Sequence, residues 1–442
     1  MKLVPAFVRR RIAHRPNLVK IIDNIGWLFL DRVLRLGLGL LVGVWVARYL
    51  GPEQFGLYSF AGAFIGLFVA ASGLGLQGIV VRDIVLNPDC KEETLGTAAA
   101  LHFAGGLLAY LLVICTIFWL RPDDSLAKVL VAILGSIMLF KVSDVAIYWF
   151  ESQVMSKYIV LAQNGCFLIF SAIKVGLILS NAPLLAFAWA NAAEALLVAF
   201  IVMIMLGLHG PQIYKLRVSL QRAKTLLSDS WPLLLSGVTI IIYMKIDQIM
   251  LGQMIGDDAV GIYSAAVRIS EVWYFVPMMI VASVFPSILE AKKNGKAHYN
   301  RRLQHLYALM VWLSVAIALP MTFLSTTVVV ALFGPAYAES GPVLAVHIWS
   351  SVFVFLGVAS SQWFIAEGRQ ILSFQRSLLG AIVNILLNLL LIPKFGAIGA
   401  AYATILSYAV AALFFDLIQT ETRHMFFMKI NAFNFVKLIE GK

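Results

Sequence analysis

Ionisable side chains lie inside long apolar stretches of this sequence, where each is costly unless it is paired or faces water. Six of them are cationic: Arg32, Arg35, Lys141, Lys174, Lys245 and Arg268. Cations at membrane depth suit an anionic ligand, whose charge cannot cross hydrocarbon unneutralised. We therefore expect these six residues to form a substrate-binding path that crosses the membrane.

Four carboxylates lie in the same apolar stretches: Asp31, Glu194, Asp247 and Glu271. A buried carboxylate has a raised pKa and can exchange a proton, and it can also bind sodium. We expect one of the four to couple transport to an ion gradient, and the sequence does not choose among them.

The alternative is that these charges form structural ion pairs. Three pairs have the spacing of neighbours on one helix: Asp31 with Arg35, Lys141 with Asp144, and Arg268 with Glu271. Arg32, Lys174 and Lys245 have no opposite charge at such a spacing. Glu194, however, lies across a short hairpin from Lys174, and the difference in depth is one that a lysine stem can span.

The elements that must position these residues are membrane-spanning helices. Hydrophobic residues make up 61% of the 442 residues, charged residues 13%, and the mean hydropathy is +0.89. Stretches of about 20 apolar residues recur, each long enough to cross a bilayer as a helix. The twelve expected spans lie near 22–49, 55–82, 95–119, 126–150, 158–179, 183–207, 230–252, 261–289, 303–324, 343–366, 371–392 and 396–419.

The distribution of basic residues predicts the orientation. Lysine and arginine are concentrated in alternate connections and at both ends, so both termini are expected in the cytoplasm. The net charge of +11 then reflects basic loops facing anionic membrane lipid and does not indicate nucleic acid. Both ends also read as amphipathic helices on the membrane surface, the first with Val4, Val8 and Ile12 and the second with Phe426, Lys429, Ile430, Phe433 and Lys437.

An internal repeat divides the chain. Residues 50–61 read LGPEQFGLYSFA and residues 255–266 read IGDDAVGIYSAA, so Gly51, Gly56 and Tyr58 recur as Gly256, Gly261 and Tyr263. Each segment follows the first helix of a six-helix half. We expect two parallel six-helix lobes, residues 1–220 and 221–442, a layout used by alternating-access transporters.

The segments VARYLGPEQFGLYSFAGAF (46–64), SWPLLLSGVTIIIYMKIDQIMLG (230–252) and VGIYSAAVRISEVWYF (260–275) resemble the polysaccharide transporter family. LFGPAYAESGPVLAVHIWSSVFVFLG (332–357) and FGAIGAAYA (395–403) are similar to it as well. This family contains Wzx-type flippases and belongs, with multidrug MATE transporters, to the MOP superfamily. The resemblance covers nearly the whole chain.

The resemblance implies an all-α, V-shaped, two-lobed protein in a bacterial inner membrane. It implies a flippase that carries undecaprenyl-diphosphate-linked oligosaccharide, such as an O-antigen unit of lipopolysaccharide, to the periplasmic leaflet. Polymerase and chain-length proteins of polysaccharide assembly are possible partners.

Two other functions stay open. A multidrug antiporter would need an acidic cavity, whereas unpaired cations are in excess here. A glycosyltransferase or polymerase would work on the same substrates, but the sequence has no D-x-D motif and no large loop to hold an active site. No cofactor is expected, and Cys90, Cys115 and Cys166 lack metal-ligand spacing. Pro277 lies in the middle of the eighth span and is the expected hinge.

Overall fold

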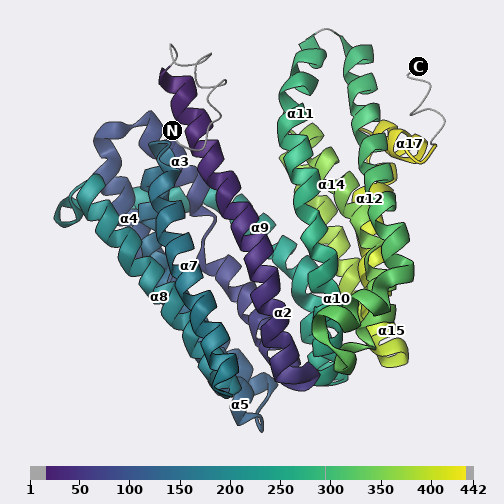
Figure 1. The fold of residues 1–442 in the computed structure, drawn as a ribbon. Helices are drawn as coiled ribbons and strands as arrows, with labels where there is room; N and C mark the ends of the chain where they lie inside the picture. The colour runs from purple at the N-terminus through teal and green to yellow at the C-terminus, as the bar shows by residue number, and fades with distance from the viewer. Residues whose placement is uncertain (1–15, 294, 435–442) are drawn as a thin grey trace. The chain divides into compact units, whose positions relative to one another are not determined.

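The chain folds almost wholly into helices. The computed structural model describes residues 16–293 and 295–434, and no β-strand occurs within them (Figure 1). The predicted amphipathic segment around Val4, Val8 and Ile12 lies outside the described residues, as does Lys437.

The helices follow one another with short connections. Those of the first half are α2 (Pro16–Ser72), α3 (Leu76–Leu86), α4 (Lys91–Leu120), α5 (Ser125–Gly135), α6 (Asp144–Ser152), α7 (Ser156–Leu179) and α8 (Leu184–His209). Those of the second half are α9 (Leu220–Met254), α10 (Asp257–Glu271), α11 (Phe275–Lys293), α12 (Lys296–Phe333), α13 (Ser340–His347), α14 (Ser350–Ala366), α15 (Gln370–Ala409), α16 (Phe415–Ile418) and α17 (Arg423–Asn431).

Ten continuous helical stretches of the described residues are long and apolar enough to cross a membrane. Two of them hold a glycine with non-helical backbone angles: Gly51 in α2 (φ 73, ψ 171) and Gly396 in α15 (φ 56, ψ −134). Each glycine divides its stretch into two helices. The prediction of about twelve spans in an all-helical membrane protein is therefore confirmed.

Two predicted spans are interrupted in the middle. The fourth consists of α5, a 3₁₀ segment (Ser136–Ser143) and α6, and the eighth consists of α10, a 3₁₀ turn (Val272–Tyr274) and α11. Pro277 lies in the first turn of α11, where its missing N–H costs no helical hydrogen bond. The interruption thus precedes the proline, and the role of Pro277 as a hinge stays a prediction.

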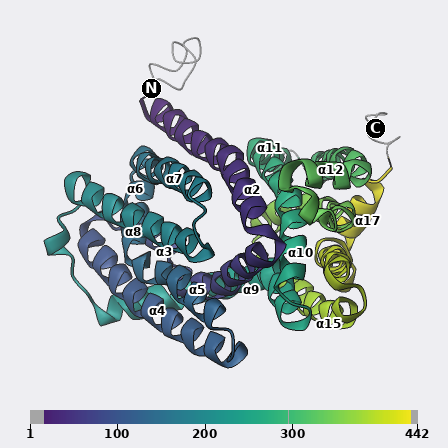
Figure 2. The same cartoon turned by 60° about the horizontal axis from the view of Figure 1, so that its bottom comes forward.

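The helices pack into two compact units. Unit 1 contains the described residues up to Tyr49 together with Phe64–Val238, and unit 2 contains Leu50–Ala63 and the described residues from Thr239 onward. The sequence placed the lobe boundary at residue 220, whereas these contacts keep 221–238 with unit 1 and place 50–63 in unit 2. In unit 1 α7 packs against α8 (Figure 2). In unit 2 α12 packs against α13 and α14.

The two repeat segments are paired within unit 2. Gly51 and Gly256 both adopt positive φ, 73° and 129°, with ψ near 170°, immediately before a helix begins. A Cβ on Gly56 would overlap the Asp257 carbonyl oxygen, and a Cβ on Gly261 would overlap the Pro52 carbonyl oxygen. The contact is reciprocal, so the repeat found in the sequence is also a repeat in structure.

Apolar side chains lie outside as well as inside each unit. Unit 1 buries a cluster around Leu76, Val80 and Leu206, and unit 2 one around Tyr307, Phe355 and Phe364. Large apolar side chains such as Trp119 are nevertheless exposed. Such a surface requires lipid as its solvent, which makes the chain a multi-pass membrane protein.

Candidate functional site

Asp247 on α9 is the most enclosed of the four predicted coupling carboxylates. Its side chain is 2% exposed, whereas Asp31, Glu194 and Glu271 are partly exposed. The hydroxyls of Tyr263 and Thr404 donate to Asp247 Oδ2 at 2.7 and 2.6 Å, and the Asn388 amide donates to Oδ1. Within the described part of the chain no ion pair neutralises Asp247.

Three helices bring these groups together, and the break at Gly396 makes the convergence possible. Tyr263 comes from α10, while Asn388 and Thr404 lie on opposite sides of Gly396 in α15. Because the chain turns at Gly396, both halves of α15 reach the same carboxylate. Asn388 also donates to Asn384 Oδ1 at 3.1 Å, one helical turn earlier.

The chemistry of this cluster suits a small hard cation or a proton. Carboxylate, amide and hydroxyl oxygens are the ligands that such cations prefer. Asn388 Oδ1 is buried and has no hydrogen-bond partner, and an amide can be turned to exchange its oxygen and nitrogen. No group of three His, Cys, Asp or Glu among the described residues can hold a metal ion, so a cation here would depend on the neutral ligands.

In unit 2 the predicted cations Lys245 and Arg268 differ in their partners. The sequence left open a pair between Arg268 and Glu271, but Glu271 instead accepts from Lys245 on α9 at 3.5 Å. That alternative is wrong because α9 brings its lysine to the carboxylate from a neighbouring helix. The Arg268 guanidinium lies over the Phe55 ring at 5.5 Å and forms no ion pair among the described residues.

In unit 1 most predicted cations are paired. Lys174 contacts Glu194 at 3.0 Å across the hairpin, as the sequence suggested. The two helix-neighbour pairs are also formed: Asp31 with Arg35 at 2.8 Å, and Lys141 with Asp144 at 3.0 Å. Arg32 is exposed and has no ion-pair partner in the described chain.

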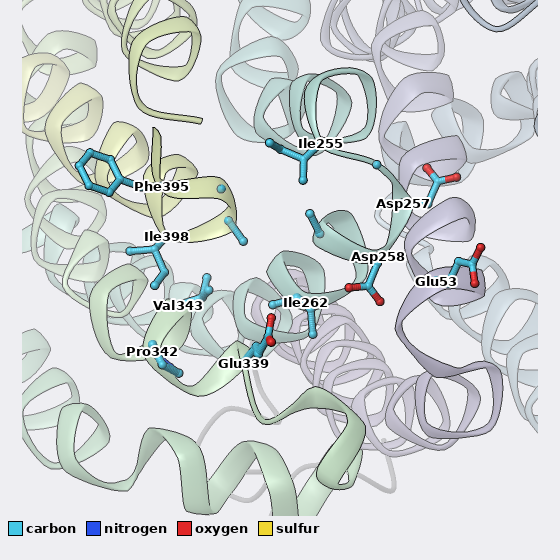
Figure 3. Close-up of a pocket in the computed structure, with 14 residues that line it drawn as sticks. Glu53, Ile255, Asp257, Asp258, Ile262, Glu339, Pro342, Val343, Phe395 and Ile398 are labelled. Carbon is cyan, nitrogen blue, oxygen red and sulfur yellow. The ribbon is translucent and has the colours of Figure 1, made fainter. Parts of the chain in front are cut away.

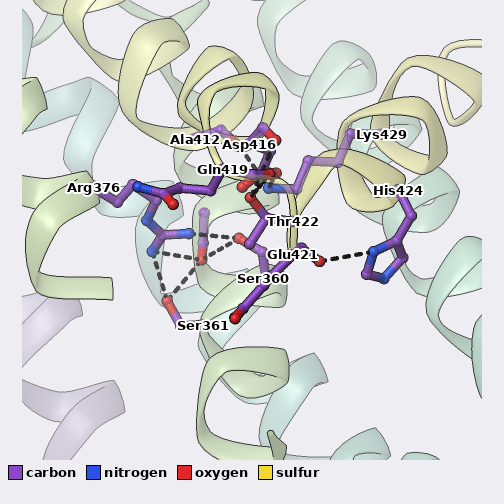
Figure 4. A network of polar contacts seen from close by, with 11 residues as sticks. Ser360, Ser361, Arg376, Ala412, Asp416, Gln419, Glu421, Thr422, His424 and Lys429 are labelled. Carbon is purple, nitrogen blue, oxygen red and sulfur yellow. Dashed lines mark hydrogen bonds and ion pairs between the residues drawn. The ribbon is translucent and has the colours of Figure 1, made fainter. Parts of the chain in front are cut away.

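A second buried aspartate, Asp416, lies near the end of the last span. Lys429 of α17 donates to Asp416 Oδ2 at 2.7 Å and to the Ala412 carbonyl oxygen at 2.6 Å, and both charged side chains are 0% exposed (Figure 4). Ala412 belongs to a π-helical turn (Val410–Phe414). Burial, only partly offset by Asp416, lowers the pKa of Lys429 to about 8.

The expectation that Lys429 anchors an interfacial helix at the membrane surface is therefore wrong. The lysine faces inward because Asp416 supplies a buried counter-charge. The apolar side chains expected beside it, Phe433 and Ile430, remain exposed.

A cavity of about 720 Å³ opens in unit 2 among the ends of several helices. Four carboxylates line it, those of Glu53, Asp257, Asp258 and Glu339, together with apolar side chains (Figure 3). Each of these carboxylates lies at or beside the start of a helix, where a negative charge is stabilised by the helix dipole. Because its lining would repel an anion, we do not assign this cavity to the cationic path that the sequence predicts.

The sequence analysis named Asp247 as one of four candidate carboxylates but did not identify the residues that donate hydrogen bonds to it. The signal for Asn384 and Asn388 was present, because two amides four residues apart share one face of an otherwise apolar helix. Thr404 offered no such signal, since only the turn at Gly396 brings it to the carboxylate.

Two family models match long segments of the chain. Residues 21–292 match the family described as polysaccharide biosynthesis protein, and residues 232–390 match the MatE family. The chain is 25% identical over 395 residues to the probable flippase AglR of Haloferax volcanii, which covers 85% of this chain and 78% of that relative.

Two solved structures share the fold. One is an inward-facing multidrug resistance MATE family transporter of the MOP superfamily, with a TM-score of 0.74, 14% identity and coverage of 91% of this chain and 99% of the other. The second is the lipid II flippase MurJ in an inward closed conformation, with a TM-score of 0.72, 16% identity and coverage of 95% and 92%. At these identities the likeness concerns the fold alone.

Proposed function

Because the chain belongs to the polysaccharide biosynthesis protein family, we propose that it is a flippase for lipid-linked oligosaccharide. The cargo is a repeat unit carried on undecaprenyl diphosphate, and it moves from the cytoplasmic to the periplasmic leaflet by alternating access. A flippase relative over most of the chain and a fold shared with a lipid II flippase support this proposal.

The observation that carries the proposal is Arg268. A guanidinium in a membrane-spanning helix is costly, and within the described residues this one forms no ion pair. A diphosphate is a ligand that a guanidinium binds with two parallel hydrogen bonds. Arg32 has the same unpaired character, while Arg35, Lys141, Lys174 and Lys245 would have to exchange a carboxylate for the cargo as it passes.

Asp247 is the coupling residue that we propose. The Asp247 carboxylate is removed from water and accepts hydrogen bonds only from neutral donors. It is therefore more stable in an access state in which a proton or a cation can bind to it. Binding of that ion to one of two access states, and not the other, would shift their populations.

The location and partners follow from the same proposal. We place the protein in a bacterial inner membrane with both termini in the cytoplasm, acting without catalysis of its own. Polymerase and chain-length proteins would then use the cargo on the far side. The relative from Haloferax volcanii is archaeal, so a prenyl carrier of another chain length is compatible with the same chemistry.

The test is flipping by the purified protein in sealed liposomes. A fluorescent prenyl-diphosphate oligosaccharide would be followed by its access to a membrane-impermeant quencher. We expect wild type to flip it and Arg268→Gln to be at least about tenfold slower, the effect of losing one charge-assisted contact. Arg369→Gln is the control, because Arg369 lies half-exposed and paired with Glu421.

A multidrug antiporter would give a different result in the same liposomes. The MATE-like fold allows this second function. It requires that organic cations are transported and that the lipid is not. That outcome, obtained with folded protein, would overturn the flippase proposal.

A further inference from the structure

We propose that Gly51, Gly62 and Gly237 are the hinges at which the chain bends when access alternates. The proposal rests on the proposed function, since a hinge is needed only if the two units move. The chain passes from one unit to the other at three places: between Tyr49 and Leu50, between Ala63 and Phe64, and between Val238 and Thr239. One of the three glycines lies within two residues of each crossing.

Packing does not explain two of these glycines. A Cβ added to Gly62 or Gly237 would meet no atom within 4 Å. By contrast, a Cβ on Gly56 would overlap a backbone oxygen. Since glycine in a helix is less favourable than alanine and space for alanine exists, flexibility is what these two positions gain.

The helix around Gly237 is weakened in two further ways. Pro232 lies inside α9 and cannot donate a helical hydrogen bond. The Ser236 hydroxyl donates to the Pro232 carbonyl oxygen at 2.9 Å, a bond that favours helix bending. Pro232, the Ser236 hydroxyl and Gly237 therefore all make α9 easier to bend just before the chain enters unit 2.

The segment between the first two crossings is held firmly by unit 2. Phe55 and Phe60 are buried, and Gly56 lies against Asp257 in the repeat contact. A rigid segment fixed to one unit needs flexible joints at both ends. Gly51 interrupts the helix at one end and Gly62 lies at the other.

The repeat supplies an internal comparison. At the constant offset of the repeat, the position equivalent to Gly62 is Val267, which is buried. The helix that carries Val267 stays in unit 2 along its whole length. A glycine therefore occurs where the chain leaves the unit and a packed, stiff residue where it does not.

The test uses Gly62→Ala, Gly237→Ala and the double variant, with Gly165→Ala as control. Gly165 lies inside α7 of unit 1, away from any crossing, and a Cβ there would also meet nothing within 4 Å. Two readouts are needed: flipping in liposomes, and the distance distribution between spin labels at Leu179 of unit 1 and Phe323 of unit 2, both exposed. The labels require a background in which Cys90, Cys115 and Cys166 are replaced.

We expect each hinge alanine to slow flipping about fivefold, the factor that corresponds to the helix preference of alanine over glycine. The double variant should be slower still and show a narrower distance distribution, with thermal stability unchanged or raised. Gly165→Ala should match wild type in both readouts.

Two outcomes would overturn the hinge assignment. One is a double variant that keeps the wild-type distance distribution, and the other is one that unfolds, because packing would then require the glycines. The distances do not depend on the cargo. A wild type that changes conformation but flips no lipid would therefore refute the proposed function and leave the hinge result readable.

Discussion

Two aspartates buried in the same unit are held in opposite ways. Asp247 lies among neutral donors, two hydroxyls and an amide, with no ion pair in the described residues. Asp416 has its counter-charge supplied by Lys429 within the same chain. The exposed fractions are nearly the same, 2% and 0%, so the difference lies in the partners.

The difference separates a site that is complete from one that still needs a positive charge. The Lys429 ammonium balances the charge of Asp416, so this aspartate needs no ion from solution, although its Oδ1 has no hydrogen-bond partner. A buried carboxylate with only neutral donors remains costly until a proton or cation arrives. We therefore assign Asp416 to stability and Asp247 to transport, and each prediction below tests one side of that assignment.

The largest effect is expected for Asp416→Asn. This change leaves the Lys429 ammonium buried without its partner, which costs about 3–5 kcal/mol in the free energy of unfolding. The measurement is unfolding by sodium dodecyl sulfate in mixed micelles. Flipping by the fraction that remains folded should be unchanged.

The matched control removes both charges. Asp416→Asn combined with Lys429→Met replaces the pair by neutral groups of similar volume and should recover most of the lost stability. If the double variant is as unstable as the single one, the pair is not what Asp416 contributes.

The pH dependence of stability tests the same pair from the lysine side. Burial lowers the pKa of Lys429 to about 8 from an ordinary value near 10.5, so between these pH values the unfolded chain binds more protons than the folded chain. Stability should therefore be highest above pH 10.5, where the lysine is neutral in both states. It should fall as pH drops toward 8, because the lysine then takes up its proton more readily in the unfolded chain. The whole change in the free energy of unfolding across this range is about 3 kcal/mol.

The comparison with Lys429→Met isolates this term from other titrating groups. We expect the stability of wild type relative to that variant to rise between pH 8 and pH 10. A flat difference in thermal unfolding across this range would mean that the lysine titrates normally and is not enclosed.

Asp247→Asn tests the other aspartate. A tenfold ion gradient stores about 1.4 kcal/mol per ion, so each coupled ion can shift the ratio of cargo between the two leaflets by up to about tenfold. The variant keeps the size of the side chain but loses the charge, and we expect its flipping to ignore the gradient. Proton and sodium gradients imposed separately would identify the ion.

The paired double variant at Asp416 and Lys429 is the control for this measurement. It should retain the wild-type response to the gradient, because the pair that it lacks carries its own counter-charge and takes up no ion from solution. If Asp247→Asn and the double variant both lose the response to the gradient, the two aspartates do not differ in ion coupling.

The sequence predicted more about some parts of the molecule than about others. Apolar length was enough to predict the twelve spans, because lipid imposes that pattern directly on the chain, and the repeat followed from matching residues at a constant offset. Asp247 was one of four candidate carboxylates, and the sequence did not choose among them. The pairing of Lys174 with Glu194 also followed, since one short hairpin fixes their relative depth.

Long-range contacts could not be predicted in the same way. Lys429 carries the same charge in a surface helix as in a buried one, and only the fold of α17 against Asp416 decides between them. Glu271 had two cations within reach, and helix packing selected Lys245 over its sequence neighbour Arg268. Residues far apart in sequence meet through tertiary packing, which periodicity does not encode.

The smallest effect is expected for Thr404→Val, which removes one neutral donor from Asp247 and keeps the volume of the side chain. The hydroxyl lies 2.6 Å from the carboxylate, and such a bond contributes about 1 kcal/mol, or about fivefold in an affinity. We expect the ion concentration that gives half-maximal flipping to change about fivefold while the maximal rate is unchanged. It should fall if the ion is a proton, because the lost hydrogen bond stabilised the empty carboxylate, and rise if the ion is sodium, because the hydroxyl oxygen is lost as a ligand. Ser407→Ala is the control, because that hydroxyl contacts Asn384 and not Asp247. A shift of the concentration dependence in Thr404→Val alone would support Asp247 as a coupling site. A fall in the maximal rate or in stability would instead show that the neutral donors of Asp247 have a structural role, as Lys429 has for Asp416.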